Sequence, residues 1–497
     1  MSLHSRAVVT TLVVLCALSE PGTAQTCSPT SGGPSAAEWI SRSVAAVGAD
    51  RLAGAVLRYQ ATASDSWNYQ SDRPWYPPYL SLYSPQEFWY DPAAGVEGAA
   101  SAPAPMTGPR VLLLAGPSAT FVRRDTLTAP AQAQHGATRK TRPLNPWSVL
   151  YDWRVAGDAR VVGRCIYREY PRIALARGAA GAEERLLIDP KTAFPVMYSR
   201  IEPHYLWGQV RVEYVYTTWQ QAGPGFYPLQ SYRLVDGAEE QTRALVITGR
   251  SDPAQPVARD SAPDLRLPDP ALRMSAVTDA FLVPTNPDTI RVAANVFLLK
   301  NRGYAELATL ERDTVFVMEA TQGDERARQD SVWIGRLFPG RHPVAVVVTD
   351  LAWPHIAGVR FWVAAGATII SHRTSRTMLE RVVSRRWTLA PDRLEARRAS
   401  SPLRFRPVTD SLRLAGGRIT LYPIDGIGSE GALMAWLPGS AMLWASDYLQ
   451  DPTQPTLYTT EVVGAARRAG IAPKQTAAQH FALTPWEKVA ALAPAQP

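Results

Sequence analysis

Hydrophobic and polar positions follow two different patterns along this chain. Between residues 54 and 248, apolar and polar residues alternate, clearly so over 210–216, and turns containing Gly or Pro interrupt the runs. From residue 295 onward, continuous apolar runs such as Val344–Val348 alternate with stretches in which apolar residues recur at the period of a helix. The pattern predicts a helix over 36–52, then a long antiparallel sheet, then an α/β layered region. The fold class is therefore α+β.

A Pro-rich stretch separates the two patterns. Residues 251–270 contain five prolines among charged and small residues, a composition typical of an exposed linker. We therefore predict a β-rich N-terminal domain over 36–250 and a second domain over 271–497.

The first 24 residues are typical of a signal peptide. Arg6 supplies positive charge, residues 7–18 form an apolar stretch too short to span a bilayer, and small residues over 22–24 permit cleavage. We therefore expect an exported protein, periplasmic or extracellular, without a transmembrane span after signal removal. Cleavage leaves Cys27 and Cys165, which an oxidising compartment permits to pair, although sequence does not show that they meet.

Composition narrows the classes of function. The 497 residues are 46% hydrophobic and 19% charged, which excludes a disordered or fibrous protein. The formal net charge is +8, carried mainly by arginines that are spread along the whole chain. Nucleic-acid-binding proteins concentrate basic residues in one patch, so we expect no nucleic-acid partner.

The strand and turn order of the N-terminal half is the basis of a first resemblance. Residues 184–196 read as strand, tight turn and strand, and further strands follow up to residue 237. This order resembles the sheet of periplasmic lipoprotein carriers, which implies a curved half-barrel that holds acyl chains or acts as a sensor. The aromatic-rich stretch 67–90 is then either a lipid-contacting lid or a plug packed over the sheet.

Several segments of the C-terminal half occur in a specific order. They are 336–349, 355–360, 366–372, 426–431 with 433–438, 443–447, and 480–486. In this order they resemble the metallo-β-lactamase fold, in the subgroup of exported metallo-hydrolases. The resemblance implies an αβ/βα four-layer sandwich and a metal-dependent hydrolase.

The chain departs from this family at the metal ligands. The family carries His-x-His-x-Asp-His after the strand that ends in Thr, whereas residues 350–355 read Asp-Leu-Ala-Trp-Pro-His, so only His355 is kept. The second metal loop of the family has a His where this chain has Gly428. Because Ala352 and Gly428 offer no ligating side chain, the resemblance implies that one of the two metal sites is lost.

The other metal site keeps most of its ligands. His355, Asp447 and His480 match three of its four positions, and Pro354 replaces the fourth. Two imidazoles and one carboxylate form a catalytic zinc set with an open position for water. Asp350 lies near enough in the loop to act as a further ligand or as a general base.

Two functions remain open from the sequence. The first is a degenerate hydrolase with at most one Zn²⁺ or other divalent ion, acting on an ester, thioester or amide. The alternative is an exported pseudoenzyme without a cofactor, which binds a lipid, a small molecule or a protein partner. In the second case His355 is a polar group hydrogen-bonded under a loop, and Asp447 caps a turn.

Overall fold

The computed structural model describes residues 27–493, with gaps. The gaps are residues 30–31, 53, 67–80, 102–110, 117–119, 125–126, 131–141, 180–181, 205, 223–224, 246–253, 267–286, 302–303, 428 and 481–482. The predicted signal peptide, most of the aromatic stretch and Gly428 therefore lie outside the described residues.

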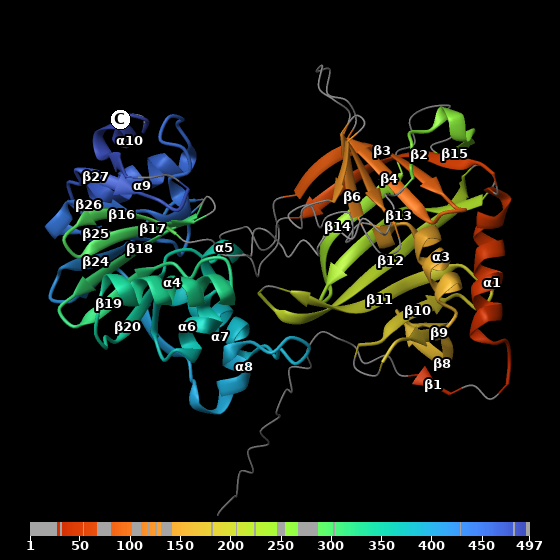
Figure 1. Ribbon diagram of the computed structural model, residues 1–497, viewed down its shortest axis with the longest axis horizontal. Coiled ribbons are helices and arrows are strands. Elements are labelled where there is room, and N and C mark those ends of the chain that lie inside the picture. The colour runs from red at the N-terminus through yellow and green to blue at the C-terminus, as the bar shows by residue number, and fades with distance from the viewer. Residues whose placement is uncertain are drawn as a thin grey trace, which may run out of the picture.

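The N-terminal half is built on one antiparallel sheet (Figure 1). Its strands lie in the order β1-β8-β9-β10-β11-β12-β13-β14-β2-β3-β4-β5-β6-β7, and β15 pairs with β2. The bounds are β1 (Cys27–Ser28), β2 (Val56–Ser66), β3 (Ser81–Asp91), β4 (Val96–Ser101), β5 (Val111–Ala115), β6 (Thr120–Arg124), β7 (Leu127–Pro130), β8 (Arg160–Tyr167), β9 (Tyr170–Arg177), β10 (Glu184–Ile188), β11 (Pro195–His204), β12 (Gly208–Ala222), β13 (Gly225–Val235), β14 (Ala238–Leu245) and β15 (Ala254–Val257).

Two helices pack against this sheet. Helix α1 (Ala36–Val47) begins at a capping box on Ser35 and ends at Gly48, whose φ of 74° favours glycine. The predicted helix over 36–52 is thus shorter, and a 3₁₀ turn over Ala49–Leu52 follows it. Helix α3 (Pro146–Ala156) was not predicted; its apolar side chains share one core with α1 and with the strands.

Part of the predicted linker belongs to the sheet. Residues Ala254–Val257 form β15, Leu265 is buried beside Val56 and Trp89, and Arg259 makes two ion-pair contacts with Asp91, at 2.5 and 2.8 Å. The expectation of an open linker over 251–270 is therefore corrected for residues 254–266, because these contacts fix them on the N-terminal half. The domain boundaries themselves stay a prediction.

Two cysteines meet at one edge of the sheet. Cys27 of β1 lies opposite Cys165 of β8, and the two form a disulfide. Among the described residues, no helix is long and apolar enough to cross a membrane.

The C-terminal half contains two further sheets. The first has the order β16 (Asp288–Ala293), β17 (Val296–Asn301), β18 (Tyr304–Glu311), β19 (Thr314–Met318), β20 (Val344–Val348), β21 (Thr368–His372) and β22 (Arg404–Val408). The second has the order β23 (Leu412–Leu414), β24 (Ile419–Pro423), β25 (Leu433–Leu437), β26 (Met442–Trp444), β27 (Gln475–Ala477) and β28 (Thr484–Pro485). Strands β19 to β22 are parallel, as are β26 and β27.

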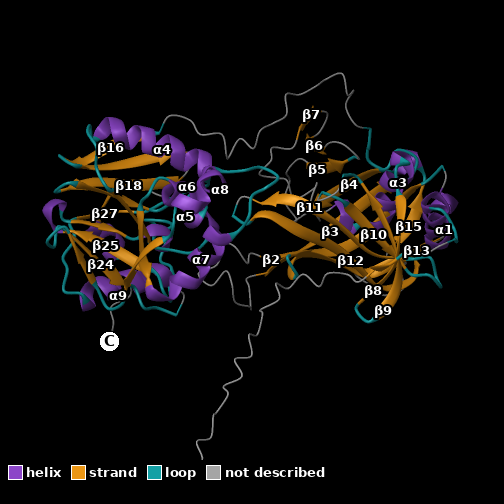
Figure 2. Ribbon diagram, turned by 90° about the horizontal axis from the view of Figure 1, so that it is seen from below, coloured by secondary structure: helices purple, strands orange, loops and turns teal. Residues whose placement is uncertain are grey.

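These two sheets form the middle layers of a four-layer arrangement. Their facing side chains make one apolar core, for example Leu307 and Val347 with Leu421 and Trp444. The outer face of the first sheet packs on α4 (Asp324–Leu337), α6 (Val359–Ala364), α7 (Arg376–Ser384) and α8 (Arg393–Arg397), and that of the second on α9 (Leu457–Arg468) and α10 (Trp486–Ala490) (Figures 1 and 2). The predicted mixed, β-rich architecture with several sheets is confirmed.

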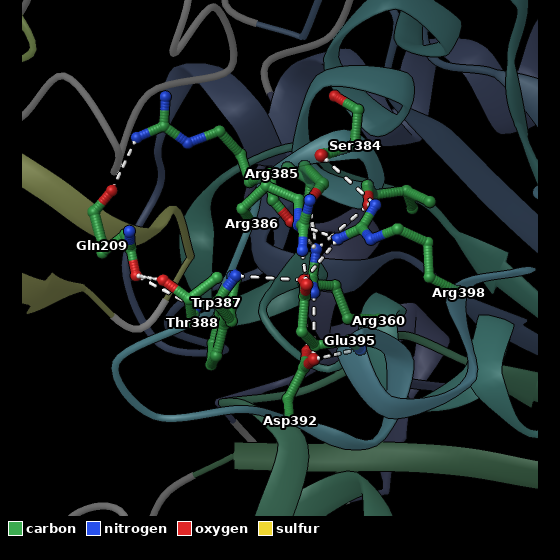
Figure 3. A network of polar contacts seen from close by, with 12 residues as sticks. Gln209, Arg360, Ser384, Arg385, Arg386, Trp387, Thr388, Asp392, Glu395 and Arg398 are labelled. Atoms are coloured by element: carbon green, nitrogen blue, oxygen red, sulfur yellow. Dashed lines mark hydrogen bonds and ion pairs between the residues drawn. The ribbon is translucent and has the colours of Figure 1, made fainter.

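The two halves touch through a polar joint, formed by residues 385–389 after α7, by Trp207 and Gln209 at the start of β12, and by Asp236 after β13. Figure 3 shows the part of the joint around Gln209. Arg385 donates to the carbonyl oxygens of Trp207 (3.0 Å) and Gln209 (2.9 Å) and pairs with Asp236 at 2.6 Å. The Oε1 atom of Gln209 accepts hydrogen bonds from the backbone of Thr388 and Leu389, both at 3.0 Å.

The joint is anchored from inside the sandwich. Arg360 of α6 is buried, forms an ion pair with Asp392, and donates to the carbonyl oxygens of Val382, Val383 and Arg385. This one side chain therefore holds the backbone of the segment that contacts the N-terminal half.

Candidate functional site

The candidate site lies where the carboxyl ends of strands from both C-terminal sheets meet. Glu319 follows β19, Asp350 follows β20, Asp447 follows β26 and His480 follows β27. The short helix α5 (Trp353–Ile356) adds His355. Loops at the carboxyl ends of parallel strands are the usual place for ligand sites in layered α/β folds.

Asp447 joins the two predicted histidines. Its Oδ2 atom lies 3.8 Å from Nε2 of His355, and its Oδ1 atom lies 2.7 Å from Nε2 of His480. The side chain of His355 is fully buried, whereas those of Asp447 and His480 are 14% and 28% exposed. The three side chains expected to share a site are thus neighbours, and solvent reaches the cluster from the His480 side.

His355 is held in place by groups that the sequence did not single out. Its Nδ1 atom lies 3.2 Å from Oε2 of Glu319 and 3.1 Å from Oγ of Ser446. Glu319 is itself fully buried, and its Oε1 accepts hydrogen bonds from Thr349 and from Nε1 of Trp444. A carboxylate on one ring nitrogen fixes the imidazole and leaves the other nitrogen available for a ligand.

Asp350 has a mixed environment. The residue is buried, and its Oδ1 accepts a hydrogen bond from the backbone N–H of Ala352 at 2.6 Å. Burial raises the pKa of Asp350 to about 6; the negative charges of Asp447 and Glu319 raise it as well, and His355 opposes them. One oxygen of Asp350 is therefore hydrogen-bonded to a loop amide, while its carboxyl group still interacts electrostatically with His355 and Asp447.

The charged groups of the cluster shift one another's pKa values. Burial alone would raise the pKa of Asp447, but His355 and His480 hold it well below its usual range. Burial alone would lower the pKa of His355, but Asp350, Asp447 and Glu319 raise it well above its ordinary value. His355 and the carboxylates around it therefore each shift the pKa of the other towards its charged form.

Tyr304 completes the rim of the cluster. Its ring lies 4.8 Å from the ring of His480, centroid to centroid. Burial, with a smaller contribution from Asp447, raises the pKa of Tyr304 to about 12, so its hydroxyl stays protonated at neutral pH. Tyr304 was also missed by the sequence analysis, because it belongs to β18, which lies far from the motif in sequence.

The donor set has features for and against a metal ion. In favour of a metal ion, the Nε2 atom of His355 is buried, has no hydrogen-bond partner among the described residues, and lies 3.8 Å from Oδ2 of Asp447. Against it, no group of three or more His, Cys, Asp or Glu side chains in the described part of the chain is arranged to hold an ion. Asp447 and His480 are bonded to each other, so this pair would have to open for both to be ligands.

Metallo-β-lactamases are among the solved structures to which the chain is similar. The chain is similar to the metallo-β-lactamase DIM-1 (13% identity, TM-score 0.34), over 42% of this chain and 96% of that one. It is similar to a metallo-β-lactamase from Hirschia baltica, with 11% identity and a TM-score of 0.33 over 43% of this chain and 100% of that one. It is also similar to the mono-zinc form of FIM-1 from Pseudomonas aeruginosa, with 12% identity and a TM-score of 0.33 over 42% of this chain and 95% of that one. No family model and no curated protein matches the chain.

Proposed function

We propose that the C-terminal sandwich is a degenerate metallo-hydrolase of the metallo-β-lactamase type that binds at most one divalent metal ion. The observation that carries this proposal is the meeting of His355, Asp447 and His480 at the carboxyl ends of the strands. The buried Nε2 of His355 supports it, because this nitrogen makes no hydrogen bond to any described residue and its ion-pair contact with Asp447 is long, at 3.8 Å.

Different residues would have different roles in such a site. His355, Asp447 and His480 would hold the ion, which when bound supplies an activated water for attack on an ester, thioester or amide carbonyl. Glu319 and Ser446 orient His355 through its Nδ1 atom. Asp350 is the candidate general base, since its carboxyl group lies within electrostatic range of the cluster.

Metal binding is the direct test. The full chain, purified and then titrated with zinc chloride in a calorimeter, is expected to bind one equivalent, and His355→Ala is expected to lose it. His342→Ala is the matched control, because His342 bonds to the carbonyl oxygens of Asp313 and Pro339, away from the cluster. Equal zinc binding by the wild type and by His355→Ala would remove this site from consideration.

A second candidate function is a pseudoenzyme that binds a lipid, a small molecule or a protein partner. It is favoured by the fact that two of the site carboxylates already have partners within the protein: Asp447 pairs with His480 at 2.7 Å, and Asp350 accepts a hydrogen bond from the Ala352 amide. If the wild type binds no zinc, and His355→Ala lowers its thermal stability, the cluster is structural and this alternative replaces the hydrolase.

We also propose that the protein is exported and that its N-terminal sheet is a half-barrel module of the lipoprotein-carrier type. Export is supported by the Cys27–Cys165 disulfide, since disulfides persist in oxidising compartments. The half-barrel is supported by the antiparallel order of the sheet and by the packing of α1 and α3 on it.

A further inference from the structure

A second cluster of buried charged groups lies between β18 and α4. It consists of Glu306 on the strand and of Arg326 and Asp330 on the helix, all three buried. Nε of Arg326 donates to Oδ2 of Asp330 at 2.5 Å, and Oε1 of Glu306 accepts a hydrogen bond from the backbone N–H of Thr321 at 2.8 Å. The cluster shares no residue with the candidate metal site.

The cluster holds two carboxyl groups and one guanidinium. The side chain of Glu306 lies within hydrogen-bonding reach of that of Asp330. Nevertheless, Oε2 of Glu306 and Oδ1 of Asp330 each find no donor among the described residues. Ionised carboxylates only accept hydrogen bonds, and two of them side by side repel each other. One proton between the two groups supplies the missing donor and makes the charges of the cluster add to zero.

The surroundings place this proton on Glu306. Burial raises the pKa of Glu306 well above its ordinary value, and the negative charge of Asp330 raises it further, while Arg326 opposes them. Arg326 bonds directly to Asp330, which favours the ionised form of that residue. Asp330 and Arg326, both on α4, are the charged groups that act on Glu306 among the described residues.

Glu306 holds a strained segment of backbone. Residues 319–323 join β19 to α4, and Glu319 and Gln322 have φ angles of 81° and 57°, which residues other than glycine rarely adopt. Such strain persists only where the surrounding contacts fix the backbone. The hydrogen bond from Thr321 to Glu306, in the middle of the segment, is one of these contacts.

The same segment holds His355 of the candidate metal site. The backbone N–H of Ala320 donates to the carbonyl oxygen of His355 at 2.9 Å, and Oε2 of Glu319 lies 3.2 Å from Nδ1 of the imidazole. Polar contacts therefore lead from Glu306 along residues 319–323 to both the backbone and the ring of His355.

We propose that Glu306 is protonated in the folded protein, shares its proton with Asp330, and positions His355 through residues 319–323. Glu306 is a positioning residue, because its contacts are with this segment and with α4. Loss of the proton to solvent at higher pH would leave two carboxylates against one guanidinium, and the hold on the segment would weaken. The candidate site is then tuned by pH from a distance; this last step rests on the proposed metal site.

Glu306→Gln tests the shared proton, because an amide can accept from Thr321 and donate to Asp330 without titrating. The unfolded wild type ionises Glu306 near its ordinary pKa, so unfolding above that pH releases a proton. The stability of the wild type should therefore fall relative to Glu306→Gln as pH rises, until the pKa of the folded state is passed. Urea unfolding between pH 5 and 9, followed by circular dichroism, is expected to show this divergence.

Glu325→Gln is the matched control for the pH series. Glu325 lies on the same helix, is 53% exposed and pairs with Arg328. Its variant is expected to run parallel to the wild type over the same pH range. Parallel curves for the wild type and Glu306→Gln would overturn the shared proton.

Zinc titration in a calorimeter at pH 7 tests the positioning role. Glu306→Ala is expected to bind zinc at least tenfold more weakly than the wild type, and Glu306→Gln within twofold of it. Glu306→Leu, which keeps the buried volume, takes the place of Glu306→Ala if that variant does not fold. Equal zinc binding by the wild type and by the Ala or Leu variant would overturn the positioning role.

A double-mutant cycle measures the same coupling without metal. Glu306→Ala, or Glu306→Leu in its place, is expected to lower the urea midpoint less when His355 is already replaced by Ala, since part of what Glu306 holds is then gone. Additive losses would contradict the positioning role. A wild type that binds no zinc would remove the metal site alone, because the pH series and the cycle need no metal.

Discussion

Cutting the chain between residues 270 and 286 is expected to leave the two halves bound to each other. An inserted protease site makes the cut specific, and the Cys27–Cys165 disulfide does not link the halves because both cysteines lie in the first one. The polar joint supplies the remaining attachment, through Arg385 and Gln209. The expected result is co-elution of both fragments in size-exclusion chromatography.

Substitutions in the joint are expected to separate the cut fragments. The double change Arg385→Ala and Gln209→Ala removes the ion pair with Asp236 and several hydrogen bonds to backbone groups, each bond contributing about 0.5–3 kcal/mol. Arg386→Ala is the matched control, because Arg386 pairs with Glu395 and is 64% exposed. Wild-type fragments that elute separately, or double-variant fragments that stay together, would contradict this role of the joint.

Local sequence patterns were sufficient to predict a strand or a helix where the apolar residues follow one clear pattern. The apolar run Val344–Val348 coincides with β20, and α4 is one of the helices in the region after residue 295 where stretches of helical period were predicted. Both elements are buried on the faces that their patterns indicate, because a continuous apolar run requires cover on both sides of a sheet.

Helix α3 shows where pattern reading failed. Its sequence has strong boundary signals: Asn145 caps it by accepting from the Trp147 N–H, Pro146 occupies the first turn, and Gly157 closes it with a φ of 67°. Its first half is buried on all sides, over the consecutive residues 146–150, so no polar face produces a helical period there. Attention to the caps would have identified this helix.

The candidate site was predictable only in part, for a physical reason. His355, Asp447 and His480 were identified through a family resemblance, and they are neighbours in the structure. Glu319 and Ser446, which hold His355, were not identified because their role depends on contacts between distant strands. The one available signal was a charged residue directly after the apolar strand Thr314–Met318, where an unpaired carboxylate would be costly to bury.

A large loss of folding stability is expected from substitutions at the buried ion pair of Glu97 and Arg243, inside the N-terminal sheet. These side chains are 3% and 2% exposed, and they meet through two hydrogen bonds of 3.0 Å. Tyr59 and Asn145 donate to the same Glu97 carboxylate at 2.7 and 2.9 Å. Arg243 also lies 4.0 Å above the ring of Phe88. The carboxylate is therefore the centre of a polar network without access to water.

Glu97→Ala is expected to lower the free energy of unfolding by about 3–5 kcal/mol, because it leaves the Arg243 charge buried and uncompensated. Replacing both partners, as Glu97→Met with Arg243→Met, is expected to cost far less, since no buried charge is then left alone. Urea unfolding followed by circular dichroism measures both, and Glu183→Ala, at a residue that pairs with the half-exposed Arg160, is the control. If the single and double variants lose equal stability, the effect comes from packing and not from the unpaired charge.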